Sequence, residues 1–181
     1  MTARRPWIQV GSSGKAVDLP SSGPINLAHI ELEDLIPALS RQCRFNGHGK
    51  IFYSVLEHMC LVSALAPAGF KLVALLHDLA ESLTGDIITP LKKAGGAGPI
   101  TTRIENAVAR RFCFQWPAAK EVKDADLWAL RIEYHHLLPH TTPWEGMDMD
   151  LPTTIPKVMQ GFLGRSPEQA QTLFWDLWAT V

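Results

Sequence analysis

The sequence predicts an all-α protein with five to seven helices in a single domain. Apolar residues recur three and four positions apart in several segments, which is the spacing of residues on one face of a helix. Helix-capping residues precede some of these segments, and prolines or glycines interrupt the chain between them. The chain contains no internal repeat and no heptad array, which favours one bundle of unlike helices.

Length and charge limit the number of domains and the class of partner. The chain has 181 residues, 46% of them hydrophobic, and its 17 basic and 18 acidic residues give a formal net charge of −1. A chain of this length forms one complete core but is too short for two ordinary domains with a linker. Its apolar content excludes intrinsic disorder. Because no basic excess is available to displace counterions, we expect no nucleic acid among its partners.

Targeting signals and cysteines indicate the compartment. No apolar run approaches the roughly 18 residues that span a bilayer, so no membrane partner is expected. Arg4 and Arg5 are not followed by an apolar stretch, which argues against a signal peptide. The three cysteines, Cys43, Cys60 and Cys113, are odd in number and widely spaced. We therefore expect a cytoplasmic protein in which each cysteine is a small buried apolar residue.

The N-terminal part begins with an arm over residues 1–25. Its glycines, serines and prolines favour an irregular arm or a short hairpin in which Trp7–Val10 forms a small strand. Leucines and isoleucines then follow helical spacing over residues 31–43. Pro37 interrupts that run, so we expect either a helix that begins near Pro37 or a short turn before it.

Two helices are predicted in the middle of the chain. Residues 44–50 contain two glycines and form a loop, and residues 53–66 then carry a wide apolar stripe. Pro67 and Gly69 end that helix. Residues 72–83 are apolar nearly all round, which is typical of a buried central helix.

Two further helices follow in the second half of the chain. The first opens with a capping box formed by Thr102 and Glu105 and ends near Phe114. The second covers about residues 118–136. Residues 139–157 hold four prolines and little periodicity, which predicts an extended loop.

The last predicted helix has the clearest beginning in the sequence. Ser166 is a suitable N-cap residue, Pro167 takes the first helical position, and Gln169 stands three residues after the cap. Leu173, Phe174, Leu177 and Trp178 then share one face, which predicts a helix packed on the core.

Polar residues interrupt the apolar helix predicted over residues 72–83. His77 and Glu81 are four positions apart, and Asp78 and Glu81 are three apart, so each pair shares a face. Burial of an imidazole and two carboxylates is costly unless they are paired. Two partners are open: a hydrogen-bond network among these side chains themselves, or a divalent cation that they face together.

Further ligands for a cation stand on neighbouring predicted helices. His58 lies on the preceding helix and Asp126 on a later one. Each alone is compatible with an ordinary core or surface residue. Together with His77 and Asp78 they supply two imidazoles and two carboxylates, a set that suits Mn, Fe, Co, Ni or Zn better than Ca. A cation of this kind polarises a phosphoryl oxygen and lowers the pKa of bound water.

The order His58, then His77-Asp78, then Asp126 resembles the signature of the HD-domain phosphohydrolases. The flanking segments that extend the resemblance over about residues 7–135 are Arg44-Phe45-Asn46-Gly47-His48, Tyr53-Ser54-Val55-Leu56-Glu57-His58, Leu75-Leu76-His77-Asp78-Leu79-Ala80-Glu81, Thr84-Gly85-Asp86-Ile87 and Pro90-Leu91-Lys92. They are similar to the compact bacterial and phage branch, which holds 5′-deoxynucleotidases of the YfbR type and dATP triphosphohydrolases of the DatZ type. The resemblance implies that residues 26–181 form a single HD-domain helical bundle.

The resemblance also assigns roles to individual residues. The implied ligands of one divalent metal ion (Mn, Co, Mg, Fe, Ni or Zn) are His58, His77, Asp78 and Asp126. Glu81 is implied to orient or activate the attacking water, and Asp86 to act in the same network. The implied substrate contacts are Arg44, Phe45, Thr89 and Lys92.

These residues together predict an enzyme. We expect a metal-dependent phosphohydrolase that acts on nucleotides, with deoxynucleotides as the leading substrate class, and releases a deoxynucleoside plus phosphate or triphosphate. The alternative is a nucleotide-sensing module that keeps the HD site for ligand affinity without turnover. The partners implied are a small-molecule nucleotide and further copies of the same chain in a homo-oligomer.

Overall fold

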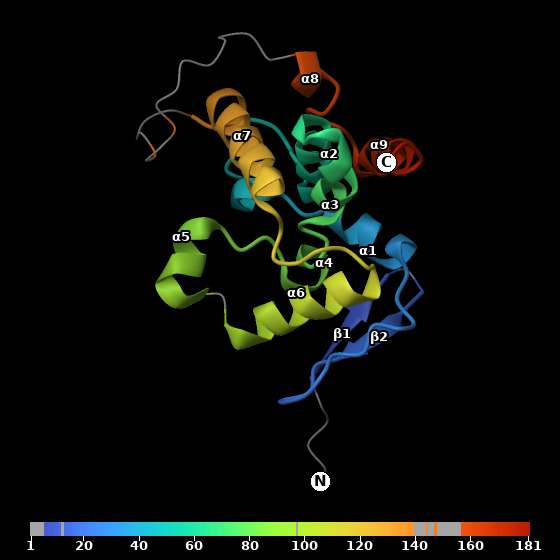
Figure 1. The fold of residues 1–181 in the computed structure, drawn as a ribbon. Helices are drawn as coiled ribbons and strands as arrows, with labels where there is room; N and C mark the ends of the chain where they lie inside the picture. Colours follow the sequence, from blue (N-terminus) through green and yellow to red (C-terminus); the bar gives the residue numbers. More distant parts are fainter. Residues whose placement is uncertain (1–5, 12, 97, 140–143, 145–146, 148–156) are drawn as a thin grey trace.

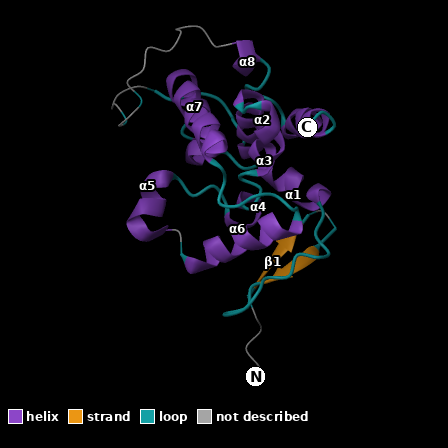
Figure 2. Cartoon of the chain, viewed as in Figure 1, coloured by secondary structure: helices purple, strands orange, loops and turns teal. Residues whose placement is uncertain are grey.

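The fold is a mostly helical bundle with one small two-stranded sheet, which confirms the all-α prediction in outline (Figures 1 and 2). The structure, a computed structural model, describes residues 6–11, 13–96, 98–139, 144, 147 and 157–181. Within these residues, no helix combines the length and the apolar character needed to cross a membrane.

The N-terminal arm contains an ordered hairpin, so the hairpin alternative and the strand at Trp7–Val10 are confirmed. β1 (Trp7–Val10) and β2 (Lys15–Asp18) pair in antiparallel register. The turn lies against α1, because a Cβ on Gly11 would come within 2.9 Å of the Asp34 carboxylate. Gly11 also has a φ of +66°, which side chains other than glycine rarely adopt.

Helix α1 (Leu32–Leu39) runs through Pro37, so the expected helix start or turn at Pro37 is wrong. A proline at this position removes only the amide that would bond to the carbonyl four residues earlier, close to the start of a short helix. Leu35, Ile36 and Leu39 are fully buried on the same helix. Their burial outweighs the lost hydrogen bond.

Helix α2 (Val55–Leu65) is the centre of the bundle. The Ser54 hydroxyl accepts a hydrogen bond from the Glu57 amide, and the Glu57 carboxylate accepts one from the Ser54 amide, which fixes the first turn. The chain leaves the helix at Ala66, before Pro67. α2 packs against α3 (Lys71–Leu76), α7 (Lys120–Leu137) and α9 (Pro167–Trp178), as Figure 1 shows.

The single helix predicted over residues 72–83 is wrong, because the chain forms two short helices there. α3 ends at Leu76, and α4 (Glu81–Thr84) begins after four residues of tight turn. Nδ1 of His77 bonds to the carbonyl of Ala74 at 2.7 Å. In a continuous α-helix the Asp78 amide would use that carbonyl. The His77 ring therefore competes with the helix backbone where the two candidate ligands stand.

The segment after α4 surrounds one side of the bundle. It comprises α5 (Thr89–Leu91), the wide helical turn η3 (Lys92–Gly96) and α6 (Pro99–Arg111). The predicted capping box of Thr102 and Glu105 is wrong, because Thr102 lies inside α6. Gly98 takes the N-cap position and Pro99 the first helical position, where its missing amide costs nothing.

The C-terminal part contains α8 (Lys157–Gln160) and α9. Ser166 and Gln169 form the predicted capping box of α9, with Pro167 at its first position. Most of the extended loop expected over residues 139–157 lies outside the described residues.

Two apolar clusters flank α2. One joins the hairpin, α1, α4, α6 and α9, the other joins α7 and α8, and α3 contributes to both. Cys60 is buried in the first cluster, as expected. Cys43 and Cys113 are exposed, which corrects the prediction for them, because both lie in connections between helices and not on a packed face.

Candidate functional site

The four side chains predicted as metal ligands converge from three parts of the fold. His58 comes from α2, His77 and Asp78 from the turn after α3, and Asp126 from α7. Nε2 of His58 lies 3.2 Å from an Asp126 oxygen and 3.6 Å from Oδ2 of Asp78, and Nε2 of His77 lies 3.2 Å from the same Asp78 atom. The ligand atoms of His58, His77 and Asp126 all lie within 4.8 Å of one another.

Both imidazole rings are held from behind by their Nδ1 atoms. Nδ1 of His77 must donate to the Ala74 carbonyl, because a carbonyl oxygen only accepts. Nδ1 of His58 lies 2.7 Å from a Glu133 oxygen, and donation to this carboxylate is the favoured arrangement. With Nδ1 protonated, a neutral ring carries a lone pair on Nε2. The lone pairs of both rings therefore face Oδ2 of Asp78, and that of His58 also faces Oδ1 of Asp126.

Lone pairs that face carboxylate oxygens at these distances repel unless a proton or a cation lies between them. Both Nε2 atoms are buried and have no hydrogen-bond partner among the described residues. Bonds of roughly 2.1 Å at right angles place neighbouring ligand atoms about 3 Å apart. The observed separations of 3.2 and 3.6 Å agree with such a ligand set. His58, His77 and Asp126 can hold a divalent transition-metal ion, with Oδ2 of Asp78 beside both rings as a further candidate ligand.

The charge of the cluster also favours a cation. Burial and the Arg44 charge oppose protonation of His58, but the carboxylates of Glu133 and Asp126 outweigh them and raise its pKa to about 10. The pKa of Asp78 is held well below its usual range, because His77, His58 and Arg44 outweigh the effect of burial. The site thus stabilises positive charge on the two rings, which a bound metal ion would supply instead.

Glu81 and Asp86, the predicted catalytic carboxylates, lie beside this cluster. Burial, with the negative charges of Asp78 and Asp86, raises the pKa of Glu81. One Glu81 oxygen lies 3.4 Å from the Lys92 ammonium, and the other is buried without a hydrogen-bond partner among the described residues. Asp86 is half-buried and its pKa is raised by burial, against the attraction of Arg44.

Arg44 reaches the cluster from a strained connection. Its guanidinium lies 3.9 Å from Asp78 and 3.2 Å from Glu133, and its pKa is raised because these carboxylates outweigh burial. Arg44 opens the helical turn η1 (Arg44–Gly47), in which Phe45 and Asn46 have φ values of +55° and +52°. Such backbone costs on the order of 1–3 kcal/mol per residue and is concentrated at functional sites.

For Phe45 and Thr89, the remaining predicted substrate contacts, the structure gives no bond to the metal-ligand cluster within the described residues. The Phe45 ring lies 5.3 Å from the Arg44 guanidinium carbon and 6.4 Å from the Trp144 ring, at the edge of the apolar clusters. Thr89 is exposed at the start of α5 and bonds to no cluster residue in the part of the chain that the structure describes. The roles of Phe45 and Thr89 stay predictions.

Glu133 is a site residue that the sequence analysis missed. It lies fully buried on α7, where it contacts both His58 and Arg44. A signal was present, because Glu133 follows Asp126 by two helical turns and lies between the apolar residues Ile132 and Tyr134. A carboxylate on the buried face of a helix needs a partner.

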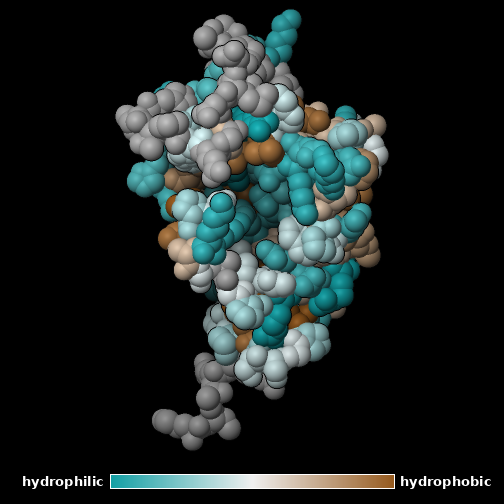
Figure 3. All heavy atoms as spheres, turned by 60° about the vertical axis from the view of Figure 1, so that its left-hand side comes forward, coloured by the Kyte–Doolittle hydropathy of each residue, from teal (hydrophilic) through white to brown (hydrophobic). Residues whose placement is uncertain are grey.

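A small cavity opens beside the cluster. It measures about 70 Å³, and its lining includes Thr101, Glu105 and Trp116, which the sequence did not single out, next to His77, Glu81 and Lys92. This volume admits about two water molecules. Figure 3, which turns the α5 side forward, shows mainly hydrophilic side chains around a hollow on this face.

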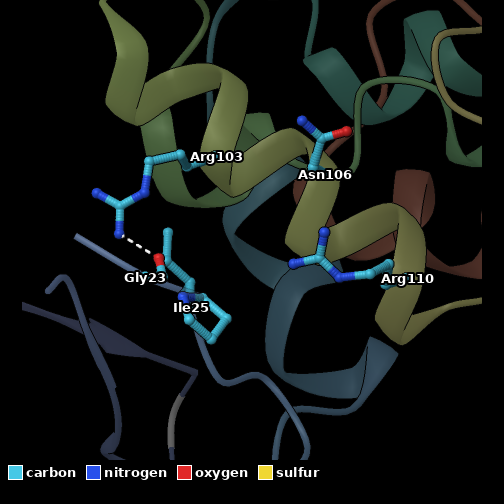
Figure 4. Close-up of a pocket in the computed structure, with 6 residues that line it drawn as sticks. Gly23, Ile25, Arg103, Asn106 and Arg110 are labelled. Carbon is cyan, nitrogen blue, oxygen red and sulfur yellow. Dashed lines mark hydrogen bonds between the residues drawn. The ribbon is translucent and has the colours of Figure 1, made fainter.

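A larger cavity lies on a different face of α6. It measures about 330 Å³ and is lined by Arg103, Asn106 and Arg110 opposite Gly23 and Ile25 (Figure 4). Arg103 donates to the Gly23 carbonyl at 2.6 Å, which attaches the segment after β2 to α6. None of the predicted site residues lines this cavity.

Comparison with known proteins places the chain among relatives without an assigned activity. No protein-family model matches the chain. It is 35% identical over 114 residues to the uncharacterized protein YfdR of Escherichia coli, and this match spans 62% of the chain and 64% of YfdR, less than two thirds of that protein. It is 37% identical over 145 residues to the uncharacterized protein RCAP_rcc00048 of Rhodobacter capsulatus, with 72% of each chain covered. The chain therefore belongs to the family of RCAP_rcc00048.

Proposed function

We propose that this chain is an HD-domain, metal-dependent phosphohydrolase that acts on nucleotides, with deoxynucleotides as the leading class. The observation that carries the proposal is the pair of buried Nε2 atoms, on His58 and His77, that face Asp78 and Asp126 without a hydrogen-bond partner among the described residues. The order of these residues along the chain, His then His-Asp then Asp, is the HD signature.

The proposed ligands, His58, His77, Asp78 and Asp126, would hold one divalent ion. When bound, the ion supplies Lewis-acid polarisation of a phosphoryl oxygen and a lower pKa for a water molecule. Such a charge also favours the ionised form of the nearby Glu81 carboxyl.

The chain supplies charge for the substrate phosphate. Arg44 offers a planar guanidinium with several donors, which suits a phosphate group. Lys92 lines the small cavity as a point charge, and its side chain is 42% exposed. The small cavity suits the phosphoryl end of a nucleotide, and the nucleoside would then lie outside it.

Glu81 would manage the proton of the reaction. Its unpartnered oxygen is buried, and the carboxyl lines the small cavity. A carboxyl at this position accepts a proton from the attacking water and is held in place by Lys92 through its other oxygen. The half-buried Asp86 adds negative charge that keeps this proton on Glu81.

The compartment follows from the same proposal. The three cysteines are free. A reducing cytoplasm, where nucleotides are abundant, agrees with free cysteines and with this substrate class. We therefore place the proposed enzyme in the cytoplasm.

Phosphate release tests the proposed function. The purified chain is incubated with Mn, Co, Mg or Zn and a panel of nucleoside mono- and triphosphates, and His77→Ala is the matched control. Turnover of one class that is absent in the variant supports the enzyme and selects between phosphate and triphosphate release. Bound metal and nucleotide without turnover would instead favour the nucleotide-sensing alternative.

A further inference from the structure

Glu133 is a fully buried carboxylate that lies between two functional groups of different kinds. One side faces His58, a proposed metal ligand, and the other faces Arg44, a proposed phosphate contact. A buried carboxylate costs several kcal/mol unless it is paired on its oxygens. Because its burial costs free energy, Glu133 is a poor choice for packing alone. Its two contacts indicate that it positions His58 and Arg44.

Each oxygen of Glu133 contacts a different residue. Oε1 lies 2.7 Å from Nδ1 of His58, and Oε2 lies 3.2 Å from a terminal nitrogen of Arg44. Neither Asp78 nor Asp126 reaches Nδ1 of His58, since both lie on its Nε2 side. A single rigid carboxylate plane therefore sets the rotation of the His58 ring and the direction of the Arg44 guanidinium.

We infer that Glu133 is a positioning residue that turns Nε2 of His58 toward the metal subsite and aims Arg44 at the phosphate subsite. The inference rests on the proposed function for the identity of the two ligands. A carboxylate accepts hydrogen bonds on both oxygens, so it holds the Nδ1–H of His58 and the guanidinium at once. Glu133 thereby couples the orientation of His58, the proposed metal ligand on α2, to that of Arg44, the proposed phosphate contact on η1.

Glutamine at this position separates the two functions. In Glu133→Gln the amide oxygen still accepts from Nδ1 of His58, so Nε2 keeps its lone pair for the metal. The amide nitrogen then faces the Arg44 guanidinium, donor against donor, and Arg44 is left with its longer contact to Asp78 at 3.9 Å. Glu133→Ala removes both contacts.

Titration calorimetry with Mn²⁺ and steady-state phosphate release, both on the full chain, test the inference. For Glu133→Gln we expect Mn²⁺ affinity within about threefold of the wild type and a KM at least tenfold higher, with kcat less affected. For Glu133→Ala we expect Mn²⁺ affinity lower by about 10–100-fold. Glu121→Gln removes an exposed carboxylate from the same helix and should change neither value.

The outcomes separate this inference from the proposed function. Wild-type Mn²⁺ affinity in Glu133→Gln and Glu133→Ala, each folded by circular dichroism, overturns the inference and leaves the function standing. An equal loss of metal affinity in both variants overturns the division of roles between the two oxygens. If the variants show the expected Mn²⁺ affinities but the wild type turns over no nucleotide, the proposed function is overturned. The role of Glu133 in positioning the metal ligand then stands. A wild-type chain that binds no Mn²⁺ overturns both. If alanine fails to fold, the isosteric glutamine variant decides alone, since an unchanged KM overturns the inference.

Discussion

Nε2 of His58 on α2 lies 3.2 Å from Oδ1 of Asp126 on α7, and this buried nitrogen has no hydrogen-bond partner in the described part of the chain. A neutral His58 ring with its proton on Nδ1 repels the carboxylate, whereas a proton or a cation at Nε2 makes the contact attractive, and the raised pKa of His58 means that the site favours such positive charge. Such a contact persists because α2 and α7 pack along apolar faces that include Leu61, Val62 and Ala129. The energy of this packing holds the ligands in place before any ion binds.

Replacement of His77 should remove metal-dependent stabilisation. A ligand at about 100 times its Kd stabilises the folded state by about 2.7 kcal/mol. We expect Mn²⁺ or Co²⁺ to raise the Tm of the wild type and to leave that of His77→Ala unchanged. His48→Ala, an exposed histidine, is the control and should respond as the wild type does. A Tm that no metal ion raises in the wild type would favour the self-paired hydrogen-bond network.

Alanine variants of the neighbouring residues Lys92 and Lys93 test the proposed phosphate contact of Lys92. The Lys92 ammonium lies 3.4 Å from Glu81 and lines the small cavity, whereas Lys93 is exposed and does not line it. A hydrogen bond to a charged group contributes about 1.5–3 kcal/mol, so Lys92→Ala should raise KM about tenfold or more. Lys93→Ala should leave KM unchanged. Equal kinetics for the two variants would remove Lys92 from the site.

Asp34 should stabilise the fold through the N-terminal hairpin. Its carboxylate accepts hydrogen bonds from Lys15 at 2.6 Å, from the Glu31 amide at 2.9 Å and from Ser13 at 3.1 Å. Asp34→Asn keeps the size but loses the charge, and we expect it to lower the free energy of unfolding by about 1.5–3 kcal/mol near neutral pH. Urea unfolding followed by circular dichroism measures this. A loss below about 0.5 kcal/mol would mean that the hairpin contributes little to stability.

The Asp34 contribution should depend on pH in a definite direction. Burial opposes ionisation, but the hydrogen bonds from Lys15, Glu31 and Ser13 outweigh it and lower the pKa of Asp34 below its ordinary value of 3.8. A lowered folded-state pKa stabilises the protein above the unfolded value, and this stabilisation is lost as the pH falls through the folded value. The difference in free energy of unfolding between the wild type and Asp34→Asn should therefore be at its full value above about pH 5. It should disappear as the pH falls below 3.8. A gap that stays constant down to acid pH would assign the effect to packing.

Phe174 on α9 should be a major core contact. It is fully buried and belongs to the cluster around α1, α2 and α6, whereas Trp178, one turn later, is 36% exposed. Phe174→Ala should lower the free energy of unfolding by about 3–5 kcal/mol. Trp178→Ala should cost clearly less, and a similar loss for both would mean that Trp178 is covered in solution. Denaturant unfolding of the two variants gives the comparison.

The sequence by itself determined the helical class, the last helix with its cap, and the residues of the cluster. Helical spacing and a capping box are local properties of the chain, so the start of α9 at Ser166 and Pro167 was readable. His77, Asp78 and Glu81 were conspicuous because charged residues in an apolar helix demand a partner. The roles assigned to them as metal ligands and catalytic groups remain predictions.

Only the tertiary structure decided the backbone around these residues and the groups that support them. Pro37 lies inside α1 because burial of its neighbours outweighs a local rule, and the helix breaks at His77 because its ring takes a backbone carbonyl. The partners of Glu133, His58 and Arg44, are distant in sequence and become adjacent only after α2, η1 and α7 pack together. Periodicity reports which face of a helix is buried, whereas the partner of a buried charge is set by how the helices pack.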